Sequence, residues 1–103
     1  MREVPFLPAA RAEFLDALDR YAAERQSLTA DFVAEMERVT HRISAFPDHG
    51  SPYLAGTRRI LLRRFPFSVV YHYDQDDLVI VAVAHQSRLP GYWRDRVDQP
   101  PQP

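Results

Sequence analysis

The sequence predicts an α+β fold: an N-terminal strand, an antiparallel helix hairpin and three antiparallel strands, with both helices on one face of the sheet. A short turn or helix is expected to close the chain. Three observations support this. Residues 8–46 have apolar side chains at helical spacing, and residues 57–85 have the alternating or continuous apolar runs of strands. Between them, residues 47–56 hold two prolines and two glycines, which are typical of turns.

The N-terminal strand is expected over residues 3–7, EVPFL. Pro5 has no N–H to give to a sheet ladder, so an edge position is favoured. Pro8 suits the first position of a helix, where the missing N–H is not needed. The first helix should bury one stripe of side chains at helical spacing. The stripe consists of Phe14, Leu15, Leu18, Tyr21 and Ala22.

A second helix is expected after Ser27 to Thr29, which interrupts the first pattern and offers a hydroxyl cap. Its apolar side chains are spaced by four and three residues, and they are interpreted as core. They are Phe32, Met36, Val39, Ile43 and Phe46. Because the connection is short, the two helices should lie antiparallel.

The first long strand is expected in TRRILLRRF, residues 57–65, before Pro66. If this segment were a continuous strand, Arg59 and Arg63 would share one face. Arg58 and Arg64 would share the other. These guanidinium groups are expected either to hold phosphates or carboxylates, or to protect an edge strand from aggregation.

Two further strands follow. FSVVYHYD, residues 67–74, alternates between a face with Phe67 and Val69 and a face with Ser68 and Val70. LVIVAVAH, residues 78–85, is apolar almost throughout, as expected of a central strand covered on both faces. The short turn between them favours an antiparallel meander.

Length and composition indicate one domain over residues 1–97, followed by a disordered tail, DQPPQP, at residues 98–103. There is no cysteine, which excludes a disulfide framework and thiolate metal sites. The four histidines are not at ligand spacing, so we expect no metal and no cofactor. No apolar run approaches the roughly 20 residues of a membrane span, and a soluble cytoplasmic protein is expected.

Charge is segregated although the net charge is only −1. Residues 50–73 hold four arginines and no acid, whereas the segments before and after are acidic. A basic segment within an acidic chain indicates an acidic partner or a phosphate site more than a general nucleic-acid binder.

The stretch HQSRLPGYWRDR, residues 85–96, gathers the remaining candidate residues. His85 could act as a general acid or base, or simply as a hydrogen-bonding residue at a strand end. Tyr92 and Trp93 could anchor a partner or pack the terminal turn onto the sheet. The nearby arginines could extend a basic surface or form a solvated face. They are Arg88, Arg94 and Arg96.

Taken in order, PAARAEFLDALDRYAAE, FPDHGSPYLAGTRRILLRRFPFSVVYHYD and LVIVAVAHQSRLPGYW resemble the RelE/ParE superfamily of type II toxin–antitoxin toxins, on the ParE-like side. The resemblance covers roughly residues 4–96. Its most specific parts are the Pro-to-Gly turn with G-x-R, the FPF-x-VVY strand and the ending VAHQSRLPGYW. That ending is similar to the H-x-x-R-x-P-x-x-W pattern of many members.

The resemblance implies a growth-inhibiting protein that is neutralised by a cognate antitoxin in a hetero-oligomeric complex. An open sheet face and a basic segment would suit an acidic, amphipathic peptide that folds on binding. The residues expected to contact such a partner are Arg58, Arg59, Arg63, Arg64 and Trp93.

The superfamily includes ribosome-associated mRNA endonucleases and inhibitors of DNA gyrase. Residues at positions matching the endonuclease set are Arg59, Arg63, His85, Arg88 and Tyr92. However, Ser68 and Gln86 stand where arginines of that set would fall. Some relatives also use a glutamate, and none lies between Glu37 and the C-terminus.

These departures favour a non-catalytic toxin that binds a protein target, with DNA gyrase the candidate. The low net charge also argues against docking to the ribosome. One alternative is an endoribonuclease of the RelE type, in which the five residues above would be catalytic. The other alternative is a decayed toxin that retains only antitoxin binding.

Overall fold

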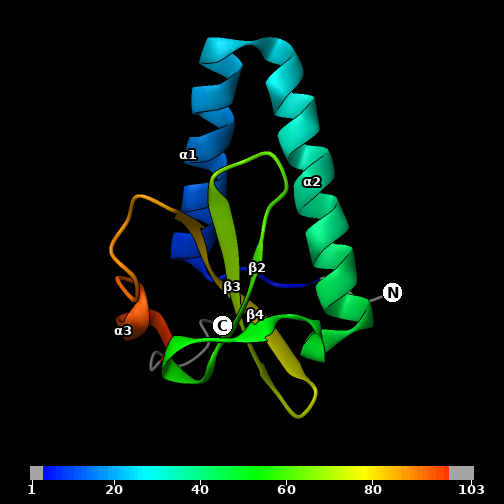
Figure 1. The fold of residues 1–103 in the computed structure, drawn as a ribbon, viewed down its shortest axis with the longest axis vertical. Helices are drawn as coiled ribbons and strands as arrows, with labels where there is room; N and C mark the ends of the chain where they lie inside the picture. The colour runs from blue at the N-terminus through cyan, green and yellow to red at the C-terminus, as the bar shows by residue number, and fades with distance from the viewer. Residues whose placement is uncertain (1–3, 98–103) are drawn as a thin grey trace.

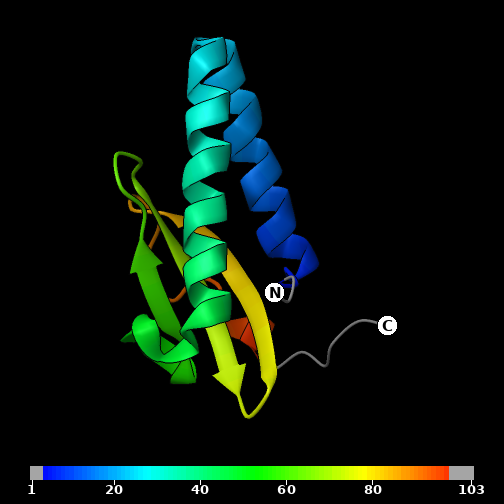
Figure 2. The same cartoon turned by 90° about the vertical axis from the view of Figure 1, so that its right-hand side faces the viewer.

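A computed structural model describes residues 4–97, so the predicted tail at residues 98–103 lies outside the described residues. Two helices form an antiparallel hairpin against one face of a four-stranded antiparallel sheet, and the hairpin extends past the end of the sheet (Figures 1 and 2). This confirms the predicted α+β fold. Along the chain, the elements are α1 (Pro8–Glu24), α2 (Gln26–Ala45), η1 (Pro47–His49), β1 (Ser51–Pro52), η2 (Leu54–Gly56), β2 (Arg58–Leu61), β3 (Phe67–Asp74), β4 (Asp77–His85) and α3 (Arg94–Val97).

The sheet has the order β1-β2-β3-β4, so the meander contains one short strand more than expected. The N-terminal segment joins the outer edge of β4 through a parallel bridge. There, Leu7 N–H donates to the Ile80 carbonyl at 2.9 Å, and Ile80 N–H donates to the Pro5 carbonyl at 2.8 Å. The predicted edge position of this segment is confirmed, but only Phe6 forms a bridge, so within residues 4–7 the predicted N-terminal strand is a single bridge and not a strand.

The helix hairpin turns at Arg25, whose backbone is extended (φ −165°, ψ 128°). Its N–H bonds to the Tyr21 carbonyl at 2.9 Å and closes α1, while its own carbonyl accepts from Leu28 N–H at 3.0 Å and starts α2. The prediction that Ser27 to Thr29 breaks the helices is therefore wrong. These residues lie in the first turn of α2, and no side chain caps that helix.

The main core lies between the hairpin and the sheet. Its centre is Phe32, which is fully buried among the rings of four other residues. These are Phe14, Tyr21, Phe65 and Phe67, with centroids 5.8, 5.3, 5.2 and 5.6 Å from that of Phe32. The α2 stripe from Phe32 to Ile43 is confirmed as core.

Three residues of the predicted stripes are exposed. Leu15 is 46% exposed, because it lies outside the face of α1 that buries Ala10 and Ala17. Ala22 is exposed as well. Phe46 is 60% exposed, because α2 ends at Ala45 and the backbone of Phe46 (φ −138°, ψ 77°) departs from helical phase.

A β-bulge explains the apolar run of β4. Val70 lies opposite Ala82, yet Tyr71 lies opposite Ile80, so Val81 is an extra residue in β4. Ile80 consequently packs into the helix-side core, whereas Val81 and Ala82 both pack on the second face of the sheet. Both faces of β4 are thus buried, as the sequence predicts.

The second face of the sheet is covered by the terminal segment, defined here as residues 86–97. Its Trp93 is only 1% exposed and packs against Val70, Val81 and Ala82. The Tyr53 ring lies alongside, with its centroid 5.9 Å from that of Trp93. Trp93 therefore packs the terminal turn onto the sheet, and its side chain is not an exposed anchor.

The predicted strand at residues 57–65 is shorter than expected. β2 ends at Leu61, and Arg63 and Arg64 lie in the loop that follows, with Arg64 in the left-handed region (φ 69°). Glu35 of α2 accepts a hydrogen bond from Arg63 N–H at 2.5 Å and holds this loop to the helix. The predictions that Arg63 shares a strand face with Arg59, and Arg64 with Arg58, are therefore wrong.

Candidate functional site

The second face of the sheet carries a groove of about 360 Å³ beside the terminal segment, called here the sheet-face groove. Among residues 4–97, no aspartate or glutamate lines it. Arg59 of β2 and Arg88 of the terminal segment are in its wall. Leu61 and Leu89 also line it and are 53% and 79% exposed, respectively. Basic and apolar groups therefore occur together in this groove.

Each arginine of the groove lies over a tyrosine ring. The Arg59 guanidinium carbon is 4.2 Å from the centroid of Tyr53, and that of Arg88 is 3.9 Å from the centroid of Tyr92. Cation–π contacts hold these side chains without neutralising them. Within residues 4–97, neither guanidinium has a carboxylate at ion-pair distance. Both charges remain available to an anionic group.

The other arginines of the basic segment have structural contacts. Arg58 donates to the Gly50 carbonyl at 2.8 Å and lies 3.7 Å from Asp48, so it fixes the turn before β1. Arg64 pairs with Asp31 of α2 at 3.6 Å. Only Arg59 of the four predicted arginines lines the sheet-face groove.

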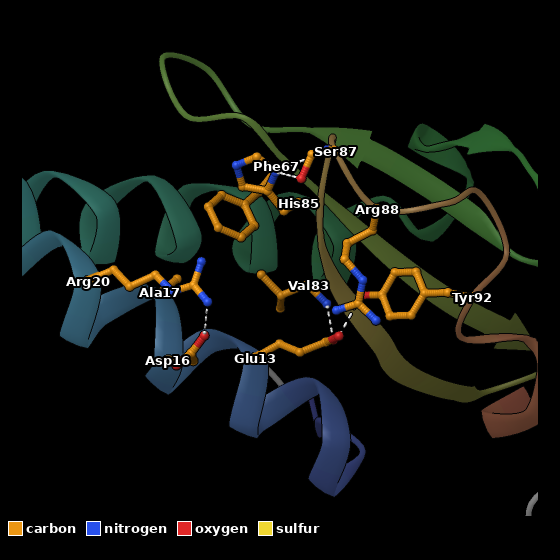
Figure 3. A pocket seen from close by; sticks show the side chains of 10 residues that line it. All are labelled: Glu13, Asp16, Ala17, Arg20, Phe67, Val83, His85, Ser87, Arg88 and Tyr92. Carbon is orange, nitrogen blue, oxygen red and sulfur yellow. Dashed lines mark hydrogen bonds and ion pairs between the residues drawn. The ribbon is translucent and has the colours of Figure 1, made fainter.

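A second, smaller hollow of about 150 Å³ lies between α1 and the end of β4, and it is called here the α1 hollow (Figure 3). Glu13, Asp16 and Arg20 project into it from α1. Facing them are four residues from the end of β4 and the terminal segment, namely His85, Ser87, Arg88 and Tyr92. Three of these four, all except Ser87, also line the sheet-face groove, so they form a wall between the two cavities.

Glu13 is the most connected side chain of the α1 hollow. Its carboxylate accepts hydrogen bonds from Val83 N–H at 3.1 Å and from the Tyr92 hydroxyl at 2.5 Å. Arg96 donates to both carboxylate oxygens, at 2.8 and 3.1 Å. Arg96 also reaches the Val81 carbonyl at 3.2 Å. Glu13 thus ties α1 to β4 and to the terminal segment.

Glu13 is a site residue that the sequence did not predict, because the expected glutamate position lay after Glu37. The partners of Glu13 are 70 to 83 residues away, and no local spacing signals such contacts. The one available signal was an acid beside Phe14, on the inward edge of α1.

Tyr92 is poorly suited to act as a general base. Burial raises the pKa of its hydroxyl, and the hydrogen bond and charge of Glu13 raise it further. For Arg96, burial lowers the pKa, but the hydrogen bond and charge of Glu13 outweigh that effect and leave the pKa raised. At neutral pH the phenol therefore stays protonated and donates to Glu13.

His85 has a local hydrogen-bonding role at the end of β4. Its Nδ1 accepts from Ser87 N–H at 3.0 Å and lies 2.7 Å from the Ser87 hydroxyl. The ring meets Phe67 edge-on at a centroid distance of 5.0 Å. Of the two positions that lack an arginine, Ser68 is buried within β3, and Gln86 is exposed after β4.

Two kinds of feature are absent from residues 4–97. That part of the chain has no group of three or more histidine, cysteine or acidic side chains able to hold a metal ion. Its helices include none that is both long and apolar enough to cross a membrane.

Comparison with known proteins identifies relatives of this arrangement. The model of the family described as "ParE toxin of type II toxin-antitoxin system, parDE" matches residues 4–90. No curated protein sequence matches the chain. The solved structure "Chromosomal ParDE TA system from P. aeruginosa" is similar with a TM-score of 0.69 at 17% identity, over 82% of this chain and 96% of that one. At that identity the likeness concerns the fold, while the family match spans most of the sequence. The chain belongs to the ParE family of type II toxin–antitoxin toxins.

Proposed function

We propose that this toxin inhibits growth by binding a protein target in the cytoplasm, with DNA gyrase the candidate, and that it does not cleave RNA. The state of Tyr92 carries this proposal. Its hydroxyl is engaged by Glu13, and its raised pKa opposes proton abstraction from a ribose. Ser68 and Gln86 supply no cation to stabilise a phosphate. The groove residues Arg59 and Arg88 are suited to contacts with carboxylates.

A supercoiling assay with purified gyrase tests the proposed target. The toxin is expected to inhibit supercoiling at micromolar concentration, and expression in cells should induce DNA-damage signalling. If supercoiling by gyrase is unaffected at that concentration, gyrase is not the target. Unimpaired growth of expressing cells would instead indicate a toxin that retains only antitoxin binding.

The proposed neutralising partner is an antitoxin segment that is acidic and amphipathic. The sheet-face groove supports this, because the described part of the chain gives its wall two guanidinium groups without a carboxylate partner, two exposed leucines and no acid. Carboxylates of the partner would meet Arg59 and Arg88, and its apolar side chains would cover Leu61 and Leu89. Co-expression with the product of an adjacent gene should restore growth and yield a stable complex. Failure of every neighbouring gene product to bind would contradict this partner.

One observation favours the endoribonuclease alternative. The α1 hollow brings together Glu13, His85, Arg88 and Tyr92, including a glutamate that was not expected there. Primer extension on cellular mRNA after toxin expression decides between the alternatives. Cuts that vanish in Tyr92→Phe and His85→Gln variants would support cleavage and reject the binding model.

A further inference from the structure

The terminal segment is attached to the rest of the fold at few points. Most of residues 86–95 are exposed, including Arg88, Leu89 and Pro90. Among the described residues, three kinds of contact hold its distal half: the buried indole of Trp93 with Tyr92 and Val97 packed beside it, the bonds of Glu13 to Tyr92 and Arg96, and the bond of Arg96 to the Val81 carbonyl. A short segment held mainly by side chains is suited to opening without the rest of the protein.

The backbone bonds of the distal half are local. Tyr92 N–H bonds to the Leu89 carbonyl at 3.2 Å, and Arg94 N–H bonds to the Gly91 carbonyl at 3.0 Å. Arg96 N–H follows the same pattern with Trp93 at 2.9 Å. Single turns of this kind have little stability of their own. Once released, these amides would exchange with solvent.

Glu13 and Arg96 also complete the outer edge of β4. The N-terminal segment pairs with this edge at Ile80 but not at Val83, whose N–H bonds instead to the Glu13 carboxylate. The Val81 carbonyl accepts from Arg96. The side chains of Glu13 and Arg96 are only 17% and 20% exposed, so each depends on the other for charge compensation. Removing either charge leaves its partner poorly solvated.

We propose that the terminal segment is a strap and that Glu13 is its latch. The strap opens as a unit while the hairpin and sheet stay folded. Arg88 and Tyr92 of the strap, together with His85 of β4, form the wall between the two cavities, so opening the strap removes two of the three wall residues and joins the α1 hollow to the sheet-face groove. If α1 moves, Glu13 can release Tyr92 and Arg96. The strap then opens, and the groove changes shape. The use of this device to regulate partner binding rests on the proposed function, but the opening itself does not.

Hydrogen exchange of the full-length protein, read by NMR, tests the opening. In the wild type, the amides of Tyr92, Arg94 and Arg96 should exchange at least about 100-fold faster than those of Val69 and Tyr71 in β3. Equal protection of both groups would overturn the proposal. This measurement requires no variant, so it stands even if a variant misfolds.

Glu13→Gln tests the latch, because it removes the charge that Arg96 needs while keeping the shape of the side chain. The strap amides should exchange at least about tenfold faster than in the wild type, with β3 exchange unchanged. Asp16→Asn is the matched control, since Asp16 lies one turn along α1 in an exposed pair with Arg20 and should leave the exchange of the strap amides unchanged.

Two outcomes would reject Glu13 as the latch: no acceleration in the strap, or equal acceleration throughout the protein. An Arg96→Met variant should accelerate the same amides. The double variant should add little, because both changes break one interaction. Additive effects would indicate two independent contacts and no single latch. The result is separable from the proposed function, because a toxin that leaves gyrase unaffected can still show selective strap opening.

Discussion

The two faces of the sheet are closed in different ways. The helix side is closed by interlocking rings around Phe32, which has no exposed surface. The second side is closed by a smaller apolar cluster around the Trp93 indole and by a polar latch, and it leaves a groove with exposed leucines beside it. Stability is therefore concentrated on the helix side. The unpaired charges and exposed apolar groups that suit binding are on the second side.

The largest expected effect is at Phe32. Phe32→Ala should lower the free energy of unfolding by about 3–5 kcal/mol, because it empties the space between four rings. Urea denaturation measures the change. Phe46→Ala is the control and should change stability by less than about 0.5 kcal/mol, since Phe46 is 60% exposed. A similar loss in both variants would contradict the placement of the core.

The next effect is at Tyr71, whose buried hydroxyl donates to the Pro47 carbonyl at 2.6 Å and accepts from Gly50 N–H at 2.9 Å. Tyr71→Phe should cost about 1–3 kcal/mol of unfolding free energy, because a buried N–H loses its partner. Tyr73→Phe, on the same face of β3, serves as the control in thermal and urea unfolding. If Tyr71→Phe is neutral, the hydroxyl does not fix the turn before β1.

Sequence periodicity predicted the helix side well. The stripe from Phe32 to Ile43 and the alternation of β3 each follow from a repeat of neighbouring residues, and such repeats are visible in the chain itself. The bulge at Val81 cannot be seen in the sequence, because it depends on how β3 and β4 pair.

The second side was harder to predict. Glu13 meets its partners across 70 to 83 residues, so no spacing in the sequence signals the contact. Arg63 was misplaced on a strand, because the attachment of its loop to Glu35 is also tertiary. The candidate site was located only in part, since its signature residues were found but not the helix residue that joins them.

Glu35, like Glu13, is a helix carboxylate that holds another segment of the chain. Its contribution to the free energy of unfolding should depend on pH. The hydrogen bond from Arg38 lowers the pKa of Glu35, burial opposes that effect, and Arg63 N–H lowers the pKa further. Because the folded pKa lies below the unfolded value, the stabilisation is fully present above about pH 4.5 and is lost as the pH falls through the folded pKa.

Glu35→Gln should therefore lower the unfolding free energy by about 1–2 kcal/mol at pH 7, and this difference from the wild type should shrink in acid. Urea denaturation at pH 7, 4 and 3 measures it, with the exposed Glu37→Gln as the control. A difference that is constant across this range would show that the charge of Glu35 does not stabilise the loop.

The smallest effect on stability is expected in the groove, where the effect on binding should be largest. Arg59→Met keeps the aliphatic length of the side chain and loses its contact with Tyr53, so unfolding should change by no more than about 1 kcal/mol. Binding of the acidic partner should weaken at least about tenfold, because one of the two unpaired guanidinium groups is gone. Titration calorimetry with the purified antitoxin measures this, and Arg25→Met at the hairpin turn is the matched control. If the two variants bind equally well, the groove is not where the partner's carboxylates lie, and the division between a stabilising face and a binding face would fail at its most direct test.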